Sequence, residues 1–190
     1  MGERSGELSR YTQRLLADVD KRLARVPPEK RPLVYFARGR RGLQTGLKGS
    51  INVESIERIG ARNVAAEGMG QGSLVSVSPE QLLAWDPEIV VTTEATFAAI
   101  TATDDVWKSI KAVRNGRLYV APMLPFPWID SPPSVNRLIG LKWLGGIFYP
   151  EVFPEDLRAE TRNFYSFFYH RAPDERQLNE LFSGAMRTRQ

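Results

Sequence analysis

Apolar residues recur at spacings of three and four near the start of the chain. This spacing places side chains on one face of an α-helix. The stripe consists of Leu8, Tyr11, Leu15, Leu16, Val19 and Leu23. We therefore expect an amphipathic helix from Glu7 to Arg25, which ends before Pro27 and Pro28.

After this helix, short apolar runs alternate with amphipathic segments. The runs LVYFA (33–37), EIVVTT (88–93) and RLYVAP (117–122) are rich in strand-forming residues. The continuous apolar character of EIVVTT is typical of a strand that is buried on both faces. Between the runs we expect helices over 51–59, 79–85 and 104–110, with Ser50 and Ser78 as the N-caps of the first two.

Alternation of strands and helices over residues 33–121 predicts a parallel sheet covered by helices. From Ser134 onwards the pattern is helical only, in three segments separated by prolines. The predicted fold class is α/β: a Rossmann-like parallel sheet lobe flanked by helices, with a long N-terminal helix and a helical C-terminal tail.

Composition excludes several kinds of chemistry. The 26 basic and 22 acidic residues are nearly balanced and mostly scattered, so we expect no nucleic-acid surface. The chain has no cysteine and one histidine, His170, which lies in the aromatic helical tail. We therefore expect no metal site, no cofactor and no enzymatic activity, because neither a nucleophile nor an acid–base pair stands out.

Two loops carry the candidate binding chemistry. The stretch 38–50 follows the first strand and carries Arg38, Arg40 and Arg41 among glycines; arginine suits bidentate binding of carboxylate or phosphate oxygens. The stretch 123–130 follows the third strand and holds Phe126 and Trp128 between prolines, where a ring could line a ligand site. The alternatives are a solvated basic loop and rings that pack against the last helices.

The glycines at 68, 70 and 72 lack the spacing of a dinucleotide-binding loop, so we expect them to form a flexible loop at the edge of a cleft. Two motifs, SPEQLLAWDPEIVVTT (78–93) and KAVRNGRLYVAP (111–122), occur in order between VYFARGRRGLQTG (34–46) and PFPWIDSPPSVNR (125–137). Together these segments resemble the C-terminal half of the iron-siderophore and cobalamin class of periplasmic binding proteins.

The resemblance implies two Rossmann-like lobes joined by a rigid helix, with the ligand held between the lobes. Residues 1–30 match the connecting helix and residues 31–190 the C-terminal lobe. We expect the N-terminal lobe and a signal sequence to be missing from this chain. The implied function is the substrate-binding component of an ABC importer for a metal chelate such as a ferric siderophore, haem or a corrinoid, in the periplasm or another extracytoplasmic place.

The resemblance also implies site residues. The family holds its ligand on loops after the strands, and the matching residues are Arg38, Arg40, Arg41, Met69, Gln71, Leu74, Glu94, Phe126, Trp128 and Asp130. A glutamate of the C-terminal lobe contacts the membrane permease in the family, and Glu80 matches it. The competing interpretations are a small Rossmann-like nucleotide-binding or enzymatic domain, and an interaction module that forms a homodimer through the surface the missing lobe would cover.

Overall fold

The structure is a computed structural model and describes residues 2–130 and 132–185. It begins with helix α1 (Gly2–Leu23), which is followed by a short 3-10 helix (Pro28–Lys30). The predicted amphipathic helix is confirmed, although it begins at Gly2 rather than at Glu7. Its apolar stripe faces the protein, because Leu15, Val19 and Leu23 are buried.

A four-stranded sheet forms the centre of the fold. It contains β1 (Leu33–Ala37), β3 (Arg62–Asn63), β5 (Ile89–Thr92) and β6 (Leu118–Val120), in the order β3-β1-β5-β6. Every pairing is parallel. All four residues of β5 are buried, as expected for an apolar run between two covered faces. The predicted parallel α/β fold is confirmed.

The sheet separates two hydrophobic cores, because successive side chains of a strand point to opposite faces. Val34 and Phe36 of β1 pack into the larger core together with the apolar side of α1. Tyr35 and Ala37, which alternate with them, pack into the smaller core around Trp107. One five-residue strand therefore contributes to both cores.

A second, two-stranded sheet was not predicted. β2 (Gln44–Gly46) pairs antiparallel with β4 (Leu74–Ser76), with Thr45 opposite Val75. The helices between β2 and β6 are short: α2 (Glu54–Arg58), α3 (Val64–Met69), α4 (Pro79–Trp85), α5 (Ala95–Ile100), α6 (Asp105–Ser109) and α7 (Lys111–Arg114). Of these, α3, α5 and α7 were also missed from the sequence.

The two predicted caps have different outcomes. Ser78 caps α4 as predicted, because its hydroxyl accepts a hydrogen bond from the amide of Gln81 at 3.1 Å. The prediction for Ser50 is wrong: α2 begins only at Glu54, and its N-cap is Val53. The Ser50 hydroxyl instead contacts Asn52, two residues along the chain.

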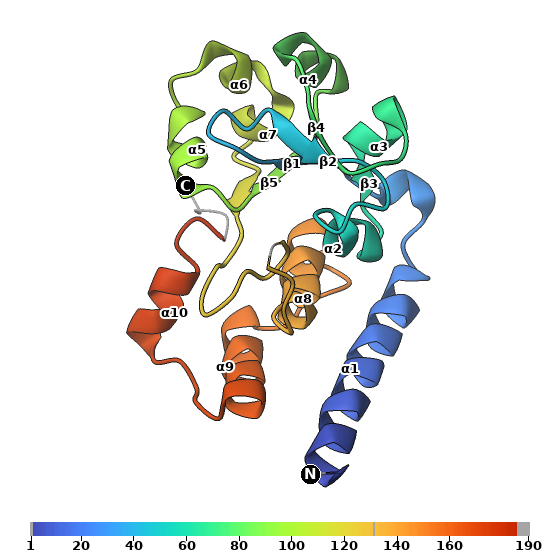
Figure 1. Cartoon of the computed structure of the whole chain (residues 1–190), viewed down its shortest axis with the longest axis vertical. Helices are drawn as coiled ribbons and strands as arrows, with labels where there is room; N and C mark the ends of the chain where they lie inside the picture. The colour runs from blue at the N-terminus through green and yellow to red at the C-terminus, as the bar shows by residue number, and fades with distance from the viewer. Residues whose placement is uncertain (1, 131, 186–190) are drawn as a thin grey trace.

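Two longer helices, α8 (Arg137–Phe148) and α9 (Leu157–Tyr169), and the seven-residue α10 (Glu175–Leu181) complete the fold. Figure 1 shows the four-stranded sheet in the upper half of the molecule and α1, α8, α9 and α10 together in the lower half. Aromatic contacts join α1 to α9; the Tyr11 ring stacks on Phe167 with their centroids 5.0 Å apart. The predicted helical tail is thus part of the main core rather than an appendage.

Candidate functional site

The order of the strands predicts a candidate ligand crevice at one edge of the sheet, between β1 and β5. The chain leaves β1 towards β3 on one side and leaves β5 towards β6 on the other. Ligands of open α/β sheets bind where the connections of neighbouring strands diverge, at the carboxyl ends of the strands. Arg38 directly follows β1 and Glu94 follows β5, so these two predicted residues flank that crevice.

Arg38 is held in place by a tight turn and by a buried carboxylate. Its amide and carbonyl form hydrogen bonds with Gln44, at 2.8 and 3.1 Å. Its Nε lies 2.9 Å from Oδ2 of Asp130, a side chain that is only 4% exposed. Nε has no hydrogen-bond partner among the described residues, so this contact is an ion pair rather than a directed hydrogen bond.

Asp130 is buried behind Arg38 instead of facing solvent, which corrects the expectation that it contacts a ligand. Its Oδ1 accepts a hydrogen bond of 2.6 Å from Nδ2 of Asn52. Oδ1 of Asn52 in turn accepts one of 3.0 Å from the hydroxyl of Ser50. Sequence reasoning missed Asn52 and Ser50 as site residues, since one polar side chain in a loop gives no signal until its distant partner is known.

Arg40 and Arg41 are exposed on the turn that follows Arg38. A residue of the smaller core holds this turn, because the indole N–H of Trp107 donates to the carbonyl of Arg41 at 3.0 Å. Gly42 has a φ of +69°, and a Cβ there would lie 2.2 Å from the Phe97 ring. Glycine is therefore required at this position, and the turn presents two guanidinium groups on a rigid support.

The loops around β2 and β4 lie side by side. The amide of Lys48 donates to the carbonyl of Gly70 at 3.3 Å, and the carbonyl of Lys48 accepts from the amide of Gly72 at 3.2 Å. The three predicted ligand residues of this region are all exposed: Met69 (45%), Gln71 and Leu74 (43%). Two of them are apolar, so this rim can cover the apolar part of a ligand.

The two aromatic residues predicted in the loop after β6 have different positions. Phe126 is 46% exposed. Trp128 is fully buried, its ring packs edge-on against Phe182, and its Nε1 donates to the Tyr165 hydroxyl at 3.3 Å. The prediction of a ligand contact for Trp128 is therefore wrong, because its ring lies inside the main core and leaves no surface for a ligand.

The remaining predicted residues lie at the surface. Glu94 is partly buried, and its amide donates to Oγ1 of Thr92 at 3.0 Å. Glu80 is exposed in the first turn of α4. Its own amide and the Ser78 hydroxyl lower the pKa of its carboxyl group, so it stays ionised at neutral pH. Leu83, one turn further along α4, is 41% exposed.

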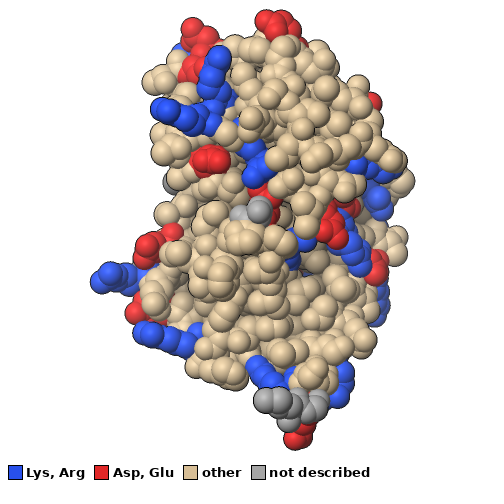
Figure 2. Space-filling model, viewed as in Figure 1, with Lys and Arg blue, Asp and Glu red and all other residues tan. Residues whose placement is uncertain are grey.

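On the face drawn in Figure 2, side chains of both charges occur, with wide uncharged areas between them. The described residues therefore form no broad basic surface on this face. Guanidinium groups beside exposed apolar side chains can bind an anion that also has an apolar body.

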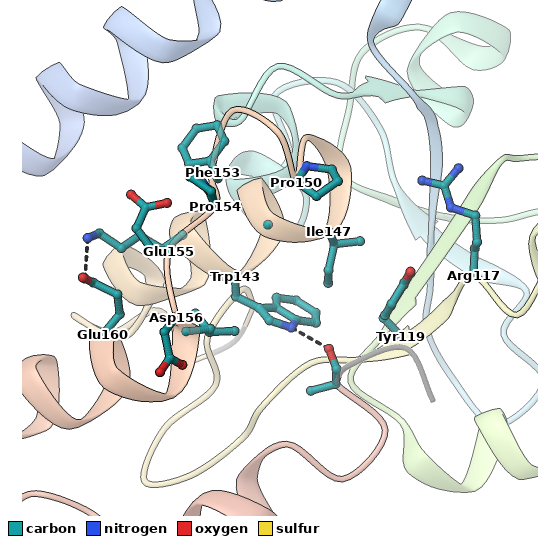
Figure 3. Close-up of a pocket in the computed structure, with 14 residues that line it drawn as sticks. Arg117, Tyr119, Trp143, Ile147, Pro150, Phe153, Pro154, Glu155, Asp156 and Glu160 are labelled. Atoms are coloured by element: carbon teal, nitrogen blue, oxygen red, sulfur yellow. Dashed lines mark hydrogen bonds and ion pairs between the residues drawn. The ribbon is translucent and has the colours of Figure 1, made fainter. Parts of the chain in front are cut away.

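A cavity of about 690 Å³ lies elsewhere. It is lined by residues of the last turns of α8 and by Arg117, which precedes β6 (Figure 3). The candidate crevice is near the other end of α8, which is 12 residues or about 18 Å long. In the cavity, the Trp143 indole donates to the carbonyl of Ala185 at 2.8 Å and Lys142 pairs with Glu160 at 2.5 Å (Figure 3), so these side chains make contacts within the chain.

Comparison with known proteins agrees with the fold. A family model described as periplasmic binding protein matches residues 5–123. No curated protein sequence matches the chain. A solved ABC transporter solute-binding protein from Sulfurospirillum deleyianum is 30% identical with a TM-score of 0.85, and the match covers 95% of this chain and 56% of that one.

Two further solved structures are similar. A periplasmic solute-binding protein from Veillonella parvula is 28% identical, with a TM-score of 0.82 and coverage of 95% of this chain and 55% of that one. The molybdate-binding protein MolA of Haemophilus influenzae, bound to molybdate, is 25% identical with a TM-score of 0.72, over 89% of this chain and 51% of that one. The present chain thus spans about half the length of these proteins.

Proposed function

This chain belongs to the periplasmic binding protein family, and from that premise we propose that the complete protein captures an anionic metal chelate and delivers it to an ABC permease. The observation that carries the proposal is the position of Arg38 at the point where the connections of β1 and β5 diverge. Ferric siderophores, haem and corrinoids are the chelates that we consider.

The surroundings of Arg38 support a ligand with two kinds of surface. Arg40 and Arg41 supply further positive charge from the same turn. Leu74 and Phe126 offer apolar contact area that is otherwise exposed to water. An anionic chelate with an apolar body gains from both, whereas a bare oxyanion gains only from the arginines. Molybdate, which MolA binds, represents that second class of ligand and is included in the test.

We also propose a structural role for each of two parts of the chain. Residues 1–30, with α1, act as the helix that connects two lobes, and residues 31–190 form the C-terminal lobe that holds half of the ligand site. Membership of the family supports an extracytoplasmic location. In the described part of the chain, no helix has the length and apolar character needed to cross a bilayer.

The test of the ligand is a calorimetric titration of the protein with ferric siderophores, haem, cobalamin and molybdate. We expect one chelate to bind and Arg38→Gln to weaken its binding by at least tenfold, the loss typical of a charge-assisted contact. The matched control is Arg114→Gln, because Arg114 is exposed at the end of α7, before β6 begins, and so lies away from the crevice. Equal affinity of wild type and Arg38→Gln would place the site elsewhere.

Glu80 is proposed as the residue that meets the permease. Its ionised carboxylate and the exposed Leu83 on the next turn form a small surface that can contact a guanidinium group of a partner. In reconstituted vesicles, Glu80→Ala is expected to lower the transport rate and leave ligand affinity unchanged. Glu151→Ala, an exposed glutamate beyond the end of α8, serves as the control. A normal transport rate with Glu80→Ala would exclude this role.

The two competing functions are tested with the same samples. A nucleotide-binding domain would release heat on titration with ATP or NAD, whereas we expect none. A dimerising module would elute from a size-exclusion column at twice the mass of the 21.5 kDa chain. The exposed apolar residues of the 123–126 loop, Met123, Leu124 and Phe126, are the surface through which we expect such a dimer to form.

A further inference from the structure

We infer that Asp130 and Asn52 are positioning residues that fix the Arg38 guanidinium for an oxygen-bearing anionic group of the ligand, such as a carboxylate. This inference rests on the proposed function, because it assigns roles behind the same site. It differs from the expectation that Asp130 contacts the ligand, since Asp130 acts through Arg38.

Burial supports a positioning role. Ser50, Asn52 and Asp130 are 5%, 8% and 5% exposed, so none of them presents a surface on which a ligand could rest. The Arg38 side chain is 22% exposed although its Nε is buried, so the exposed part belongs to other atoms of that side chain. Arg38 is therefore the member of this group that can touch a ligand.

The hydrogen bonds give the group a direction. Asp130 accepts a hydrogen bond from the Asn52 amide with one oxygen and forms an ion pair with Arg38 through the other. These two contacts fix the orientation of the Asp130 carboxylate, and the fixed carboxylate in turn favours one position of the Arg38 guanidinium group. Because Nε–H is not directed at Asp130, the carboxylate fixes the position of Arg38 through charge and leaves the guanidinium donors for another acceptor.

The pair also sets how the site discriminates among anions. Asp130 lies 2.9 Å from Arg38 and offsets its charge, so Arg38 attracts anions by charge alone less than Arg40 and Arg41 do. Binding then depends on the geometry of planar N–H donors, which lysine cannot reproduce. We therefore expect Arg38→Lys, which keeps the charge, to lose nearly as much affinity as Arg38→Gln.

The first measurement needs no ligand. In ¹⁵N-labelled chain, we expect the Nε–Hε signal of Arg38 to exchange slowly with water, because Nε is buried in the ion pair. Asn52→Ala should speed this exchange about tenfold, since it frees the Asp130 carboxylate to turn. Unchanged exchange in Asn52→Ala would overturn the inference.

The second measurement is the affinity for two probes, citrate and molybdate, followed by the same signals. Asp130→Asn keeps an oxygen that can accept from the Asn52 amide but removes the negative charge that holds Arg38. We expect it to weaken binding about tenfold. The control is Asp20→Asn, which breaks another Asp–Arg pair, Asp20 with Arg58, at the α1 surface and should leave the affinity unchanged.

The outcomes separate the two proposals. If Asp130 merely opposes anions by its charge, Asp130→Asn will bind citrate more tightly than wild type, and the positioning role is wrong. If Arg38→Gln and wild type bind the probes equally, or neither binds, the proposed site fails, and the exchange measurement alone then decides whether Asn52 fixes Arg38. If Asp130→Asn does not fold, Ser50→Ala replaces it, because Ser50 is the member of the group farthest from Arg38 along the hydrogen bonds. We expect Ser50→Ala to weaken probe binding less than tenfold, and tighter binding would contradict the inference.

Discussion

Substituting Gly140 tests whether the loop that carries Asp130 is built on α8 with no space between them. Gly140 is buried in α8, and a Cβ at this position would lie 2.0 Å from the carbonyl oxygen of Trp128. Real Cβ atoms do not approach closer than 3.0 Å, so Gly140→Ala must separate helix and loop by about 1 Å. The atom that it meets is backbone, which cannot turn aside.

The expected cost follows from two opposing terms. Overpacking of this kind destabilises by about 1–3 kcal/mol, while alanine gains about 0.5–1 kcal/mol over glycine inside a helix. We expect Gly140→Ala to lower the free energy of unfolding by about 1–2 kcal/mol. Gly146 in the same helix is the matched control, since a Cβ there meets only the Phe153 carbonyl oxygen, at 3.8 Å. Gly146→Ala should raise the free energy by about 0.5–1 kcal/mol.

Urea unfolding followed by the fluorescence of the four tryptophans measures both variants. Their midpoints should move in opposite directions at a similar m-value. Equal stability of Gly140→Ala and Gly146→Ala would show that loop 126–130 does not pack on α8 as described. The displaced loop should also speed the exchange of the Arg38 Nε–Hε proton, because Asp130 moves with Trp128.

Three further results are expected. Trp128→Ala should lower the free energy of unfolding by about 3–5 kcal/mol because it empties a fully buried site, whereas Phe126→Ala at the surface should change it by no more than about 0.5 kcal/mol. Urea unfolding compares the two variants, and a larger loss of stability for Phe126→Ala would contradict the positions of these rings. Ser78→Ala should cost about 1 kcal/mol by removing the α4 cap, and no change in the unfolding midpoint would mean that the cap is not formed in solution. Burial raises the pKa of Tyr149 and Tyr165 from 10.0 to about 12. Their contribution to stability is therefore complete below pH 10 and is lost as the pH rises towards 12, by about 1.4 kcal/mol per pH unit for each phenol. Absorbance at alkaline pH should show both phenols titrating above pH 10, and normal titration of either would exclude its burial.

The sequence predicted the central fold because its signals are local. A strand buried on both faces must be apolar along its whole length, and β1 and β5 meet this condition. β2, β3 and β4 were missed for the opposite reason: they have two or three residues each, and β2 and β3 carry the polar sequences QTG and RN. Their formation depends on pairing with segments that are remote in sequence, and a local sequence pattern carries no information about those segments.

The candidate site was predicted less completely, and the reason is similar. Arg38, Arg40 and Arg41 could be found because a basic loop after a strand is a local feature. Phe126 and Trp128 share the same proline-rich segment, so sequence alone could not tell which ring faces the solvent. Asn52 gained a role only through Asp130, which is 78 residues away.

This separation affects the order of events during synthesis. The hydrogen bond between Asn52 and Asp130 closes a loop that contains β3, β4, β5 and β6, so it can form only after those strands have been made and paired. A chain that has grown no further than β5 has Arg38 but lacks the carboxylate that fixes it. The proposed anion site is therefore incomplete in partly made chains, which lack the carboxylate beside Arg38.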